Sequence, residues 1–379
     1  MTLDLLAALR AGLSDDPSAP RPAGIEIRQD LSPAGGLPVQ PPSYEGRLEI
    51  HPRYLDGEDI PRPVIELDSV GSAANRLEEV LLELHRAGRY PLPLSDTTVE
   101  PTDGEPITIT TLDTPHRIFD AWMRLSAGSN GDGTFEQSEQ GRELSLAHIG
   151  AIDVVLETSA HDLLLGAWDS HRKGPYGQLR IGRSLTTSLI GIDPVEQAQF
   201  AARRDPLNLG EASDLPRDAE RLSRQGLSSI PPQQRVPYRE NGSDKRANGF
   251  NGGVAITEAR YLGFLSFASL RRLGFARYDP VEARTLLALL ALYALELRAA
   301  AGWDLRARCA LVPKGELQLT LAGADGSREP FALGVGQAEQ LFRDAVGRVG
   351  VTDRSVHLRA GARLNGMVDR AVAASAARS

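Results

Sequence analysis

The sequence predicts an α+β fold rather than a doubly wound α/β fold, and three observations support this. Alternating apolar residues, as at 305–311 and 317–321, have the period of strands with one covered face. Apolar residues every three or four positions, as at 77–84, have the period of helices. The two kinds of segment interleave irregularly, and two long insertions interrupt them. This arrangement is typical of a sheet-and-helix core of ferredoxin-like type.

The stretch 64–88 carries the clearest local prediction. The apolar run from Val64 to Leu67 is typical of a short strand, and a tight corner at Gly71 and Ser72 follows it. Ser72 is the expected N-cap, because its hydroxyl can accept a hydrogen bond from an amide of the first helical turn. Gly88 suits the left-handed residue that ends many helices. The side chains expected on the buried helix face are Leu77, Val80, Leu81 and Leu84.

Two interpretations are open for the polar residues at the start of this helix. Asn75 and Arg76 follow Ser72 in the expected first turn. In the simpler interpretation, Arg76 is a solvated residue of a capped helix. In the functional one, Ser72, Asn75 and Arg76 present amides and a guanidinium to an anion such as phosphate.

The preceding segment is expected to hold one strand and one wide loop. Ile25 to Arg28 alternates in polarity and predicts the strand. Residues 33–46 contain too many prolines and glycines for regular structure. Gly35 and Gly36 either belong to an ordinary loop or let the backbone approach a ligand closely.

Residues 89–125 are expected to form a hairpin and a helix. Thr97–Val99 and Ile107–Thr110 flank Asp103-Gly104, which is a hairpin signal. Few hairpin residues are apolar on one face, so we expect the hairpin to project from the core. Pro115 suits the first helical position of the segment that follows. We expect His116 and Arg117 in the exposed first turn of that helix.

The middle of the chain combines expected regular elements with two basic segments. We predict a helix at 144–156 and a strand at 161–166. The window 171–184 contains Arg172, Lys173, Arg180 and Arg183 and no acidic residue. It is either a solvated charge run or a footprint for nucleic acid. The polar, proline-rich insertion 203–253 ends in a basic, glycine-rich run with Lys245 and Arg246.

The last third has the most regular pattern. The expected elements are a helix at 261–274 ending near Arg271 and Arg272, a buried helix from Pro280 to Gly302, a strand at 304–312, a partner strand at 317–321 and a helix at 338–349. Arg306 and Arg308 would leave the same face of the strand at 304–312. Either they hold phosphates there, or a covering helix forces them to pair with acids such as Glu282 or Glu296.

Composition excludes several classes of protein. The net charge of −8 provides no bulk field for a polyanion. Lys occurs only at Lys173, Lys245 and Lys314, so arginine dominates the basic residues, either for phosphate contacts or through a GC-rich coding bias. The single Cys309 excludes an internal disulfide and a cysteine-based zinc site. We expect no signal peptide, no membrane span, no metal or cofactor, and a location in the cytoplasm.

No established catalytic motif occurs in the sequence. The seven histidines are scattered, and an isolated histidine is more often structural than catalytic. His116, His161 and His171 lie near basic segments, so a metal-independent ribonuclease remains an alternative. We expect the protein not to be an enzyme.

Several segments, in this order, resemble the CRISPR-associated RAMP backbone subunit of type I-U (I-G) effector complexes. The segments are SVGSAANRLE at 69–78, PHRIFDA at 115–121, GAWDS at 166–170, RDPL at 204–207, GGV at 252–254, LSFASLRRL at 265–273 and GWDLRARC at 302–309. Two positions depart from the family pattern. Ala307 stands where serine is usual, and LTTSLI at 185–190 replaces a Ser-Glu-Ile run.

The resemblance implies an RNA-recognition-motif-like palm with a projecting β-hairpin thumb and a web-like loop. The palm would comprise 25–88, 126–202 and 254–350, the thumb hairpin and its helix 89–125, and the loop 203–253. Copies would polymerise along a guide (CRISPR) RNA and present it to target DNA in antiviral defence. Other partners would be a large subunit and a fused guide-processing subunit.

The RNA-binding residues expected from the basic segments and this resemblance form one set. They are Arg28, Gly35, Gly36, Ser72, Asn75, Arg76, His116, Arg117, Arg172, Lys173, Arg180, Arg183, Lys245, Arg246, Arg271, Arg272, Arg306 and Arg308.

Overall fold

The computed structural model describes most of the chain. The described residues are 4–18, 21–42, 48–55, 57–102, 104–128, 133–170, 172, 176–197, 199–204, 206–207, 229–235 and 252–376. Of the expected RNA-binding residues, Lys173, Lys245 and Arg246 lie outside these ranges, as does His171.

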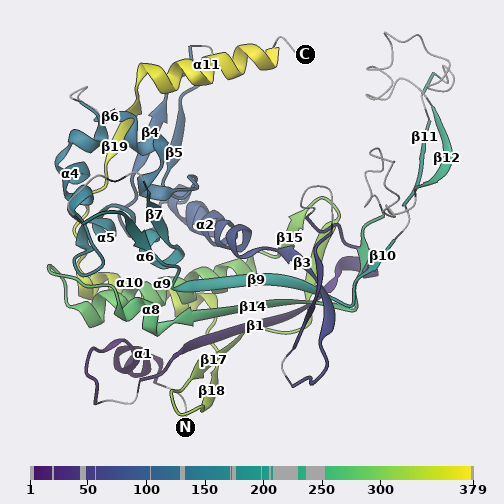
Figure 1. Ribbon diagram of the computed structural model, residues 1–379, viewed down its shortest axis with the longest axis horizontal. Helices are drawn as coiled ribbons and strands as arrows, with labels where there is room; N and C mark the ends of the chain where they lie inside the picture. The colour runs from purple at the N-terminus through teal and green to yellow at the C-terminus, as the bar shows by residue number, and fades with distance from the viewer. Residues whose placement is uncertain are drawn as a thin grey trace.

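A curled antiparallel sheet of nine described strands forms the base of the molecule (Figure 1). Its central strands are β1 (Gly24–Pro33), β14 (Glu258–Ser266), β9 (Leu185–Ile192) and β3 (Arg62–Asp68). The peripheral strands are β2 (Ile50–Arg53), β15 (Trp303–Arg306), β16 (Cys309–Pro313), β17 (Gln318–Ala322) and β18 (Arg328–Phe331). Strand β1 pairs with β14 along one edge, and β17 and β16 share its other edge.

Close packing of strands requires a glycine at the centre of this sheet. Gly263 of β14 lies opposite Ile27 of β1 and Thr187 of β9. A Cβ atom at this position would lie 2.6 Å from a side-chain carbon of Thr187 and 2.8 Å from the carbonyl oxygen of Thr186. The strands can therefore keep this separation only with glycine here.

Helices cover one face of the sheet. They are α1 (Leu5–Leu13), α2 (Val70–Arg86), α8 (Phe267–Arg271) and α9 (Pro280–Ala300), with α10 (Val335–Val349) packed on α9. Asp279 caps α9 by accepting from the amides of Val281 and Glu282. Helix α9 is apolar almost all round and buried along most of its length, as its sequence predicts.

The opposite face of the sheet is open. Arg28, Thr186, Leu262 and Phe264 line a groove of about 700 Å³ on this face. Arg28 pairs there with Asp30, at 3.0 Å between guanidinium and carboxylate. The open face is thus polar with a half-buried apolar centre.

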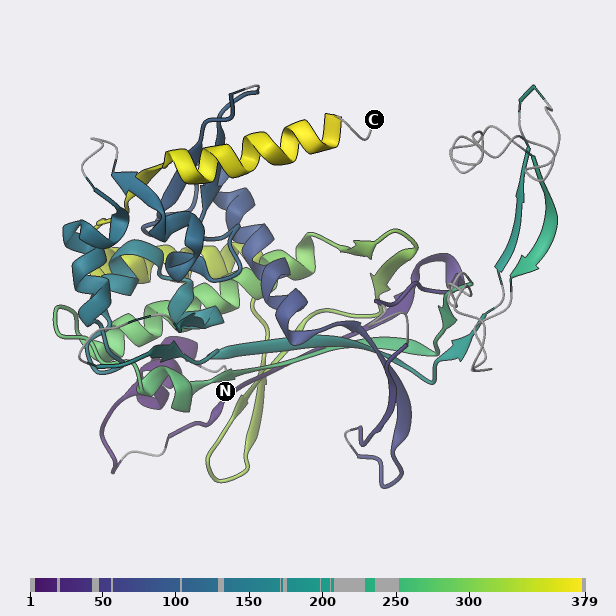
Figure 2. The ribbon, with the colours of Figure 1, turned by 45° about the horizontal axis from the view of Figure 1, so that its top comes forward.

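Short elements lie above α9 and beside α2 (Figures 1 and 2). They are the 3₁₀ turn η2 (Arg117–Phe119), α3 (Ala121–Arg124), η3 (Phe135–Gln137), α4 (Glu139–Leu146), α5 (Asp153–Ser159), α6 (Asp162–Leu165), β7 (Ala167–Asp169) and β8 (Leu179–Ile181). A further 3₁₀ turn, η1 (Ala34–Gly36), follows β1.

A second sheet includes the predicted hairpin. Its strands, in the order β5-β4-β19-β6, are Ile107–Thr110, Asp96–Val99, His357–Ala360 and Ser126–Gly128. The hairpin forms, but the expectation that it projects from the core is wrong for its root. The side chains of Thr97, Val99 and Thr110 are buried, and the C-terminal strand β19 pairs with β4. Thr97 contacts Met123 of α3, and Val99 packs with Leu364. The terminal helix α11 (Ala362–Ala376) packs beside this sheet through Leu364.

A different ribbon projects from the body. Strands β11 (Gln199–Arg203) and β12 (Ile230–Arg235) pair and extend away from the main sheet in both ribbon views (Figures 1 and 2). We call the β11–β12 ribbon the arm. At its base, β10 (Val195–Glu196) pairs with β13 (Val254–Ala255). The insertion predicted as a loop at 203–253 therefore contains one strand of a paired ribbon.

The fold class is confirmed: the molecule is α+β, and its curled sheet is compatible with an RNA-recognition-motif or ferredoxin-like fold. The strands at 25–28 and 64–67, the buried face of α2, the long buried helix and the helix at 338–349 occur as predicted. None of the described helices has both the length and the apolar character that crossing a membrane requires.

Two predictions of helix or strand are reversed. Residues 261–266 belong to β14, because Tyr261 and Leu265 face the helices while Leu262 and Phe264 face the open groove. Apolar residues on both faces imitate a helical pattern. Residues 162–165 form helix α6 rather than a strand, and the helix predicted at 144–156 is interrupted by a turn between α4 and α5.

The strand predicted at 304–312 is a hairpin. The chain reverses between Arg306 and Cys309, where Arg308 adopts a left-handed conformation with φ 64°. Apolar and polar residues still alternate along this segment, because Leu305 and Cys309 are buried on either side of the turn. Strand β17 pairs with β1 rather than with this segment.

Two further local predictions need correction. Helix α2 begins one turn earlier than expected, and Ser69 rather than Ser72 caps it by accepting from the Ser72 amide. The helix expected after Pro115 is divided into η2 and α3 by Asp120, which is extended with ψ 155°, and Arg117 at the start of η2 has φ 54°. A left-handed residue cannot continue an α-helix.

Burial of Glu296 in α9 predicts an unusual pH dependence of stability. Its side chain has no hydrogen bond or ion pair within the described residues, and it is 9% exposed. Burial and the nearby Glu316 carboxylate raise its pKa from 4.5 to about 7. The neutral form therefore stabilises the fold fully below about pH 4.5, and this contribution is lost as the pH rises through about 7.

We expect Glu296→Gln to melt close to the wild type at pH 5 and above it at pH 8, measured by thermal unfolding without nucleic acid. Glu105→Gln, at an exposed position, corrects for the general loss of one negative charge. A constant difference in melting temperature across this pH range would contradict the assignment.

Candidate nucleic-acid interface

A groove between α2 and the β7–β8 hairpin brings together residues from three predicted basic or polar segments. Two adjoining pockets share Pro115, Arg117 and Arg183, and we treat them as one. The residues that define this Trp168 groove are Asn75, His116, Trp168, Arg180 and Arg183. The predicted segments at 69–76, 115–117 and 171–184 thus converge, although they are far apart in the sequence.

An exposed indole and a guanidinium form the floor of the groove. Trp168 of β7 lies opposite Arg180 of β8 in the ladder. The guanidinium carbon of Arg180 lies 4.8 Å from the centre of the indole ring, a cation–π contact. Trp168 is 42% exposed, and Arg180 has no carboxylate partner among the described residues. Such a pair can stack on a base and contact a phosphate.

Arg183 forms one wall of the groove. Its Nε donates to the carbonyl oxygen of Leu165 at 3.1 Å. Burial, and then the nearby Arg117, lower the pKa of Arg183 from its ordinary value. An anion in the groove would stabilise the protonated form of this guanidinium.

Arg117 lies beneath the groove rather than in an exposed turn. The sequence-based expectation of exposure is wrong, because its side chain is 7% exposed and donates to Glu78 at 2.7 Å. A second donation at 2.6 Å reaches the carbonyl oxygen of Gly166. Burial raises the pKa of Glu78 to about 7 against the opposing effect of Arg117. Arg117 therefore joins α2 to the strand that carries Trp168.

His116 and His161 differ in their exposure to solvent. His116 is exposed at the rim of the groove. His161 is completely buried, and burial lowers its pKa to about 3, so it stays neutral at physiological pH. The Ser159 hydroxyl donates to Asp162 at 2.6 Å beside it. His161 is therefore inaccessible to a substrate, although it lies near a basic segment of the sequence.

Arg76 and Arg306 meet at a buried carboxylate instead of facing solvent separately. Arg76 lies 4.0 Å from Asp68 and donates to the carbonyl oxygen of Leu305 at 2.6 Å. Arg306 lies 3.8 Å from Asp68 and donates to the carbonyl oxygen of Leu67 at 2.8 Å. The two arginines fasten the β15–β16 hairpin to the start of α2. Glu282 and Glu296 are not their partners: Glu282 pairs with Arg10 and Arg348.

Gly35, Gly36 and Arg308 lie at a third corner. Both glycines have a left-handed backbone, with φ 64° and 69°. The Arg308 guanidinium donates to the carbonyl oxygen of Gly252 at 2.9 Å, and Arg308 shares a small pocket with residues that follow the glycines. This corner brings the loop, the hairpin turn and the base of the arm together.

Other expected residues lie elsewhere. Arg28 is on the open sheet face. Arg271 donates to the carbonyl oxygen of Gly12, and Arg272 is exposed directly after α8. Ser72 lies at the start of α2 near Asp68. Arg172 lines a separate pocket behind β7.

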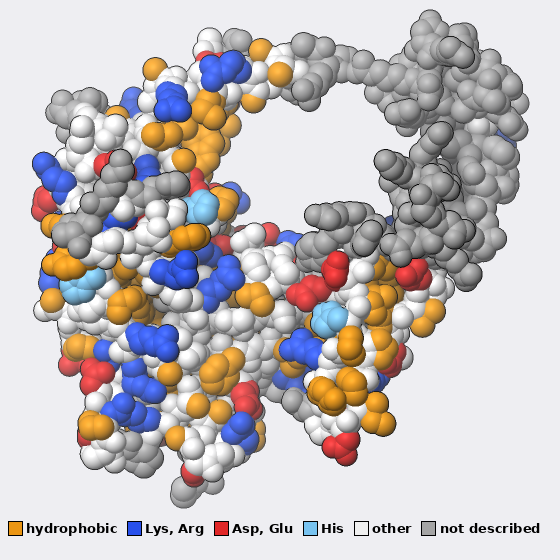
Figure 3. All heavy atoms as spheres, viewed as in Figure 1, with side chains coloured by type: hydrophobic (Ala, Val, Ile, Leu, Met, Phe, Trp, Pro, Cys, Tyr) orange, Lys and Arg blue, Asp and Glu red, His pale blue; other side chains and the backbone are white. Residues whose placement is uncertain are grey.

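Basic side chains gather on the face shown in Figure 3, both where α2, α6 and β7 meet and lower down over α8 and α1. Trp168 is absent from the residues predicted to bind RNA. Its signal was the alternation of Ala167, Trp168 and Asp169 after Gly166, which places the indole outward once this segment forms a strand.

Residues 25–195 match the family described as CRISPR-associated protein GSU0053. This part of the chain is therefore similar to a CRISPR-associated protein, and it contains β1, α2 and all of the Trp168 groove. No curated protein is similar enough to the chain to count as a match.

The geometry distinguishes a structural arginine from an accessible one. Arg117→Met would leave Glu78 buried without its partner, so we expect a loss of about 3–5 kcal/mol in unfolding free energy. Arg180→Met removes an exposed guanidinium and should change stability by less than about 0.5 kcal/mol. Urea unfolding at pH 8 measures both.

The loss for Arg117→Met should shrink at pH 5, because protonation then removes the unpaired charge on Glu78. Equal stability of the two variants at pH 8 would contradict a structural role for Arg117.

Proposed function

We propose that the protein is a non-enzymatic, guide-RNA-binding backbone subunit of a type I-U (I-G) CRISPR effector complex. The observation that carries this proposal is the Trp168 groove, with its exposed indole, the adjacent Arg183 and an Arg180 that pairs with no carboxylate in the described part of the chain. Support also comes from the match of residues 25–195 to a CRISPR-associated family. The resemblance of the segments at 204–207, 252–254, 265–273 and 302–309 to the type I-U backbone subunit extends this support beyond residue 195.

The groove has the chemistry needed to hold any guide. Arginine binds phosphate without reading sequence, and an indole stacks on any base. A net charge of −8 is compatible with RNA binding, since phosphate contacts depend on local rather than total charge. The exposed bases would remain free to pair with target DNA.

The arm is the better candidate for the thumb that contacts a neighbouring copy. The β4–β5 hairpin is anchored in a sheet by β19, whereas β11–β12 extends away from the body (Figure 2). An isolated two-stranded ribbon is marginal in water, so a surface on the next copy or on the guide would stabilise it. Other subunits of the complex, including a large subunit and a guide-processing subunit, complete the proposed assembly in the cytoplasm.

We expect Trp168→Ala to weaken binding of single-stranded RNA by about 1–3 kcal/mol, independent of sequence, because one stacking contact is lost. Arg180→Gln should reduce the slope of log affinity against log salt concentration by about 0.7, the value for one phosphate contact. Fluorescence anisotropy at several salt concentrations measures both.

Arg343→Gln is the matched control, because Arg343 is a partly exposed arginine on α10 that is paired with Glu339. Unchanged affinity and slope in the Trp168 and Arg180 variants would overturn the proposed interface. Cleavage of precursor RNA that disappears in His116→Ala would instead indicate a ribonuclease. Co-purification of RNA of uniform length from cells carrying a CRISPR array would support the backbone role.

The arm can be removed without opening the sheet. The amide of Gln197 donates to the carbonyl oxygen of Gly253 at 3.0 Å, so the two ends of the arm are adjacent. Replacing residues 199–251 by a short Gly/Ser turn should leave the melting temperature nearly unchanged. The variant should bind RNA but no longer form multi-copy assemblies in light scattering.

A matched variant shortens the tip of the β4–β5 hairpin at residues 101–105, which leaves both strands intact. It should assemble normally. Loss of assembly in this variant, with normal assembly of the arm deletion, would reassign the thumb to the hairpin.

A further inference from the structure

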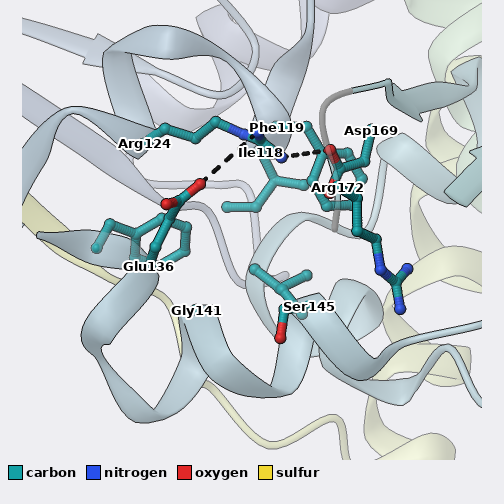
Figure 4. A pocket seen from close by; sticks show the side chains of 10 residues that line it. Ile118, Phe119, Arg124, Glu136, Gly141, Ser145, Asp169 and Arg172 are labelled. Carbon is teal, nitrogen blue, oxygen red and sulfur yellow. Dashed lines mark hydrogen bonds and ion pairs between the residues drawn. The ribbon is translucent and has the colours of Figure 1, made fainter. Parts of the chain in front are cut away.

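A second pocket lies behind β7, on the side opposite to the Trp168 groove. Successive residues of a strand point to opposite faces. Trp168 therefore faces the groove, while Asp169 lines a cavity of about 570 Å³ (Figure 4). The apolar walls of this cavity are Ile118, Phe119, Phe135 and Leu144, and its volume suits a small organic molecule.

One guanidinium in this pocket lacks partners. The Nε and one terminal nitrogen of Arg172 are buried, and neither has a hydrogen-bond partner within the described part of the chain. Unpaired buried donors of this kind are rare in folded proteins and need an explanation. Burial lowers the pKa of Arg172 in spite of the nearby Asp169, so a bound anion would stabilise the charged form.

The other charged side chains of the pocket lining have partners among the described residues. Arg124 donates to Asp169 in a short ion pair, and it lies 3.7 Å from Glu136. Figure 4 shows these contacts and shows Arg172 outside them. The Glu136 side chain is 62% exposed at the rim, where water screens it. Among the described residues that line the pocket, Arg172 is thus the charged side chain without an ion pair.

We infer that this pocket binds a small organic monoanion with an apolar or aromatic body, whose anionic group pairs with Arg172. The phenyl rings of Phe119 and Phe135 and the side chain of Leu144 enclose the body. A carboxylate fits better than a phosphate monoester, because a dianion would leave excess negative charge close to Asp169. The inference needs no RNA and is independent of the proposed function.

The test uses the full-length protein without nucleic acid and 4-phenylbutyrate as the probe. Isothermal titration should detect one site for 4-phenylbutyrate, and 4-phenylbutanol should bind at least tenfold more weakly. Phenyl phosphate, which is a dianion, should bind more weakly than 4-phenylbutyrate. Equal binding of acid and alcohol would show an apolar cavity only and overturn the inference, and tighter binding of the phosphate would overturn the choice of a monoanion.

Two variants localise the site. Arg172→Gln should reduce the affinity for 4-phenylbutyrate at least tenfold, while Arg180→Gln, which faces the groove, should leave it unchanged. Ser145→Trp places a bulky side chain at an exposed position of the pocket lining and should block binding even if Arg172→Gln fails to fold. Retention of affinity in a folded Arg172→Gln or Ser145→Trp protein, or no binding of any anion, would overturn the assignment.

Discussion

The buried ion pair between Arg117 and Glu78 fixes the relation between the two halves of the groove. Glu78 belongs to α2, which packs on the main sheet, and Arg117 belongs to the layer of short elements above it. The same guanidinium donates to the carbonyl oxygen of Gly166, immediately before β7. A charge pair with this little exposure tolerates few alternative geometries, because displacement of either partner leaves a buried charge unpaired. The position of Trp168 relative to α2 therefore depends on a contact that RNA need not touch.

Most of the scaffold could be predicted from single-sequence periodicity. The buried face of α2 and strands such as β1 have patterns in which one period dominates. Helix α9 is instead a long apolar run that begins at a capping Asp279. Prediction failed at β14, where apolar side chains occupy both faces, and at the β15–β16 hairpin, where the alternation passes through a turn. At β14 the pairing with the distant strands β1 and β9 decided the structure, and at the β15–β16 hairpin a turn at Arg308 did so. Periodicity alone carries information on neither.

In the candidate site, too, the sequence predicted local features but not long-range contacts. Sequence reasoning selected the arginines by local charge, yet Arg76, Arg117 and Arg306 are held by protein carbonyls and carboxylates. Arg180 keeps its guanidinium accessible because its partner is the face of an indole rather than an acid. Which arginines are neutralised depends on long-range neighbours such as Asp68 and Glu78. Local charge density thus selected several residues that line the Trp168 groove, but it did not separate accessible arginines from those paired within the protein.

The base of the arm has a consequence for how this protein can diversify. Strands β10 and β13 hold the two ends of the insertion together. The structure of the main sheet therefore does not depend on the length or sequence of the segment between them. The entropy of closing a loop grows only with the logarithm of its length, and a doubling costs about 0.6 kcal/mol. Related chains can therefore lengthen, shorten or rewrite this segment at little thermodynamic cost. The length and sequence of the arm can change in evolution while the main sheet stays the same.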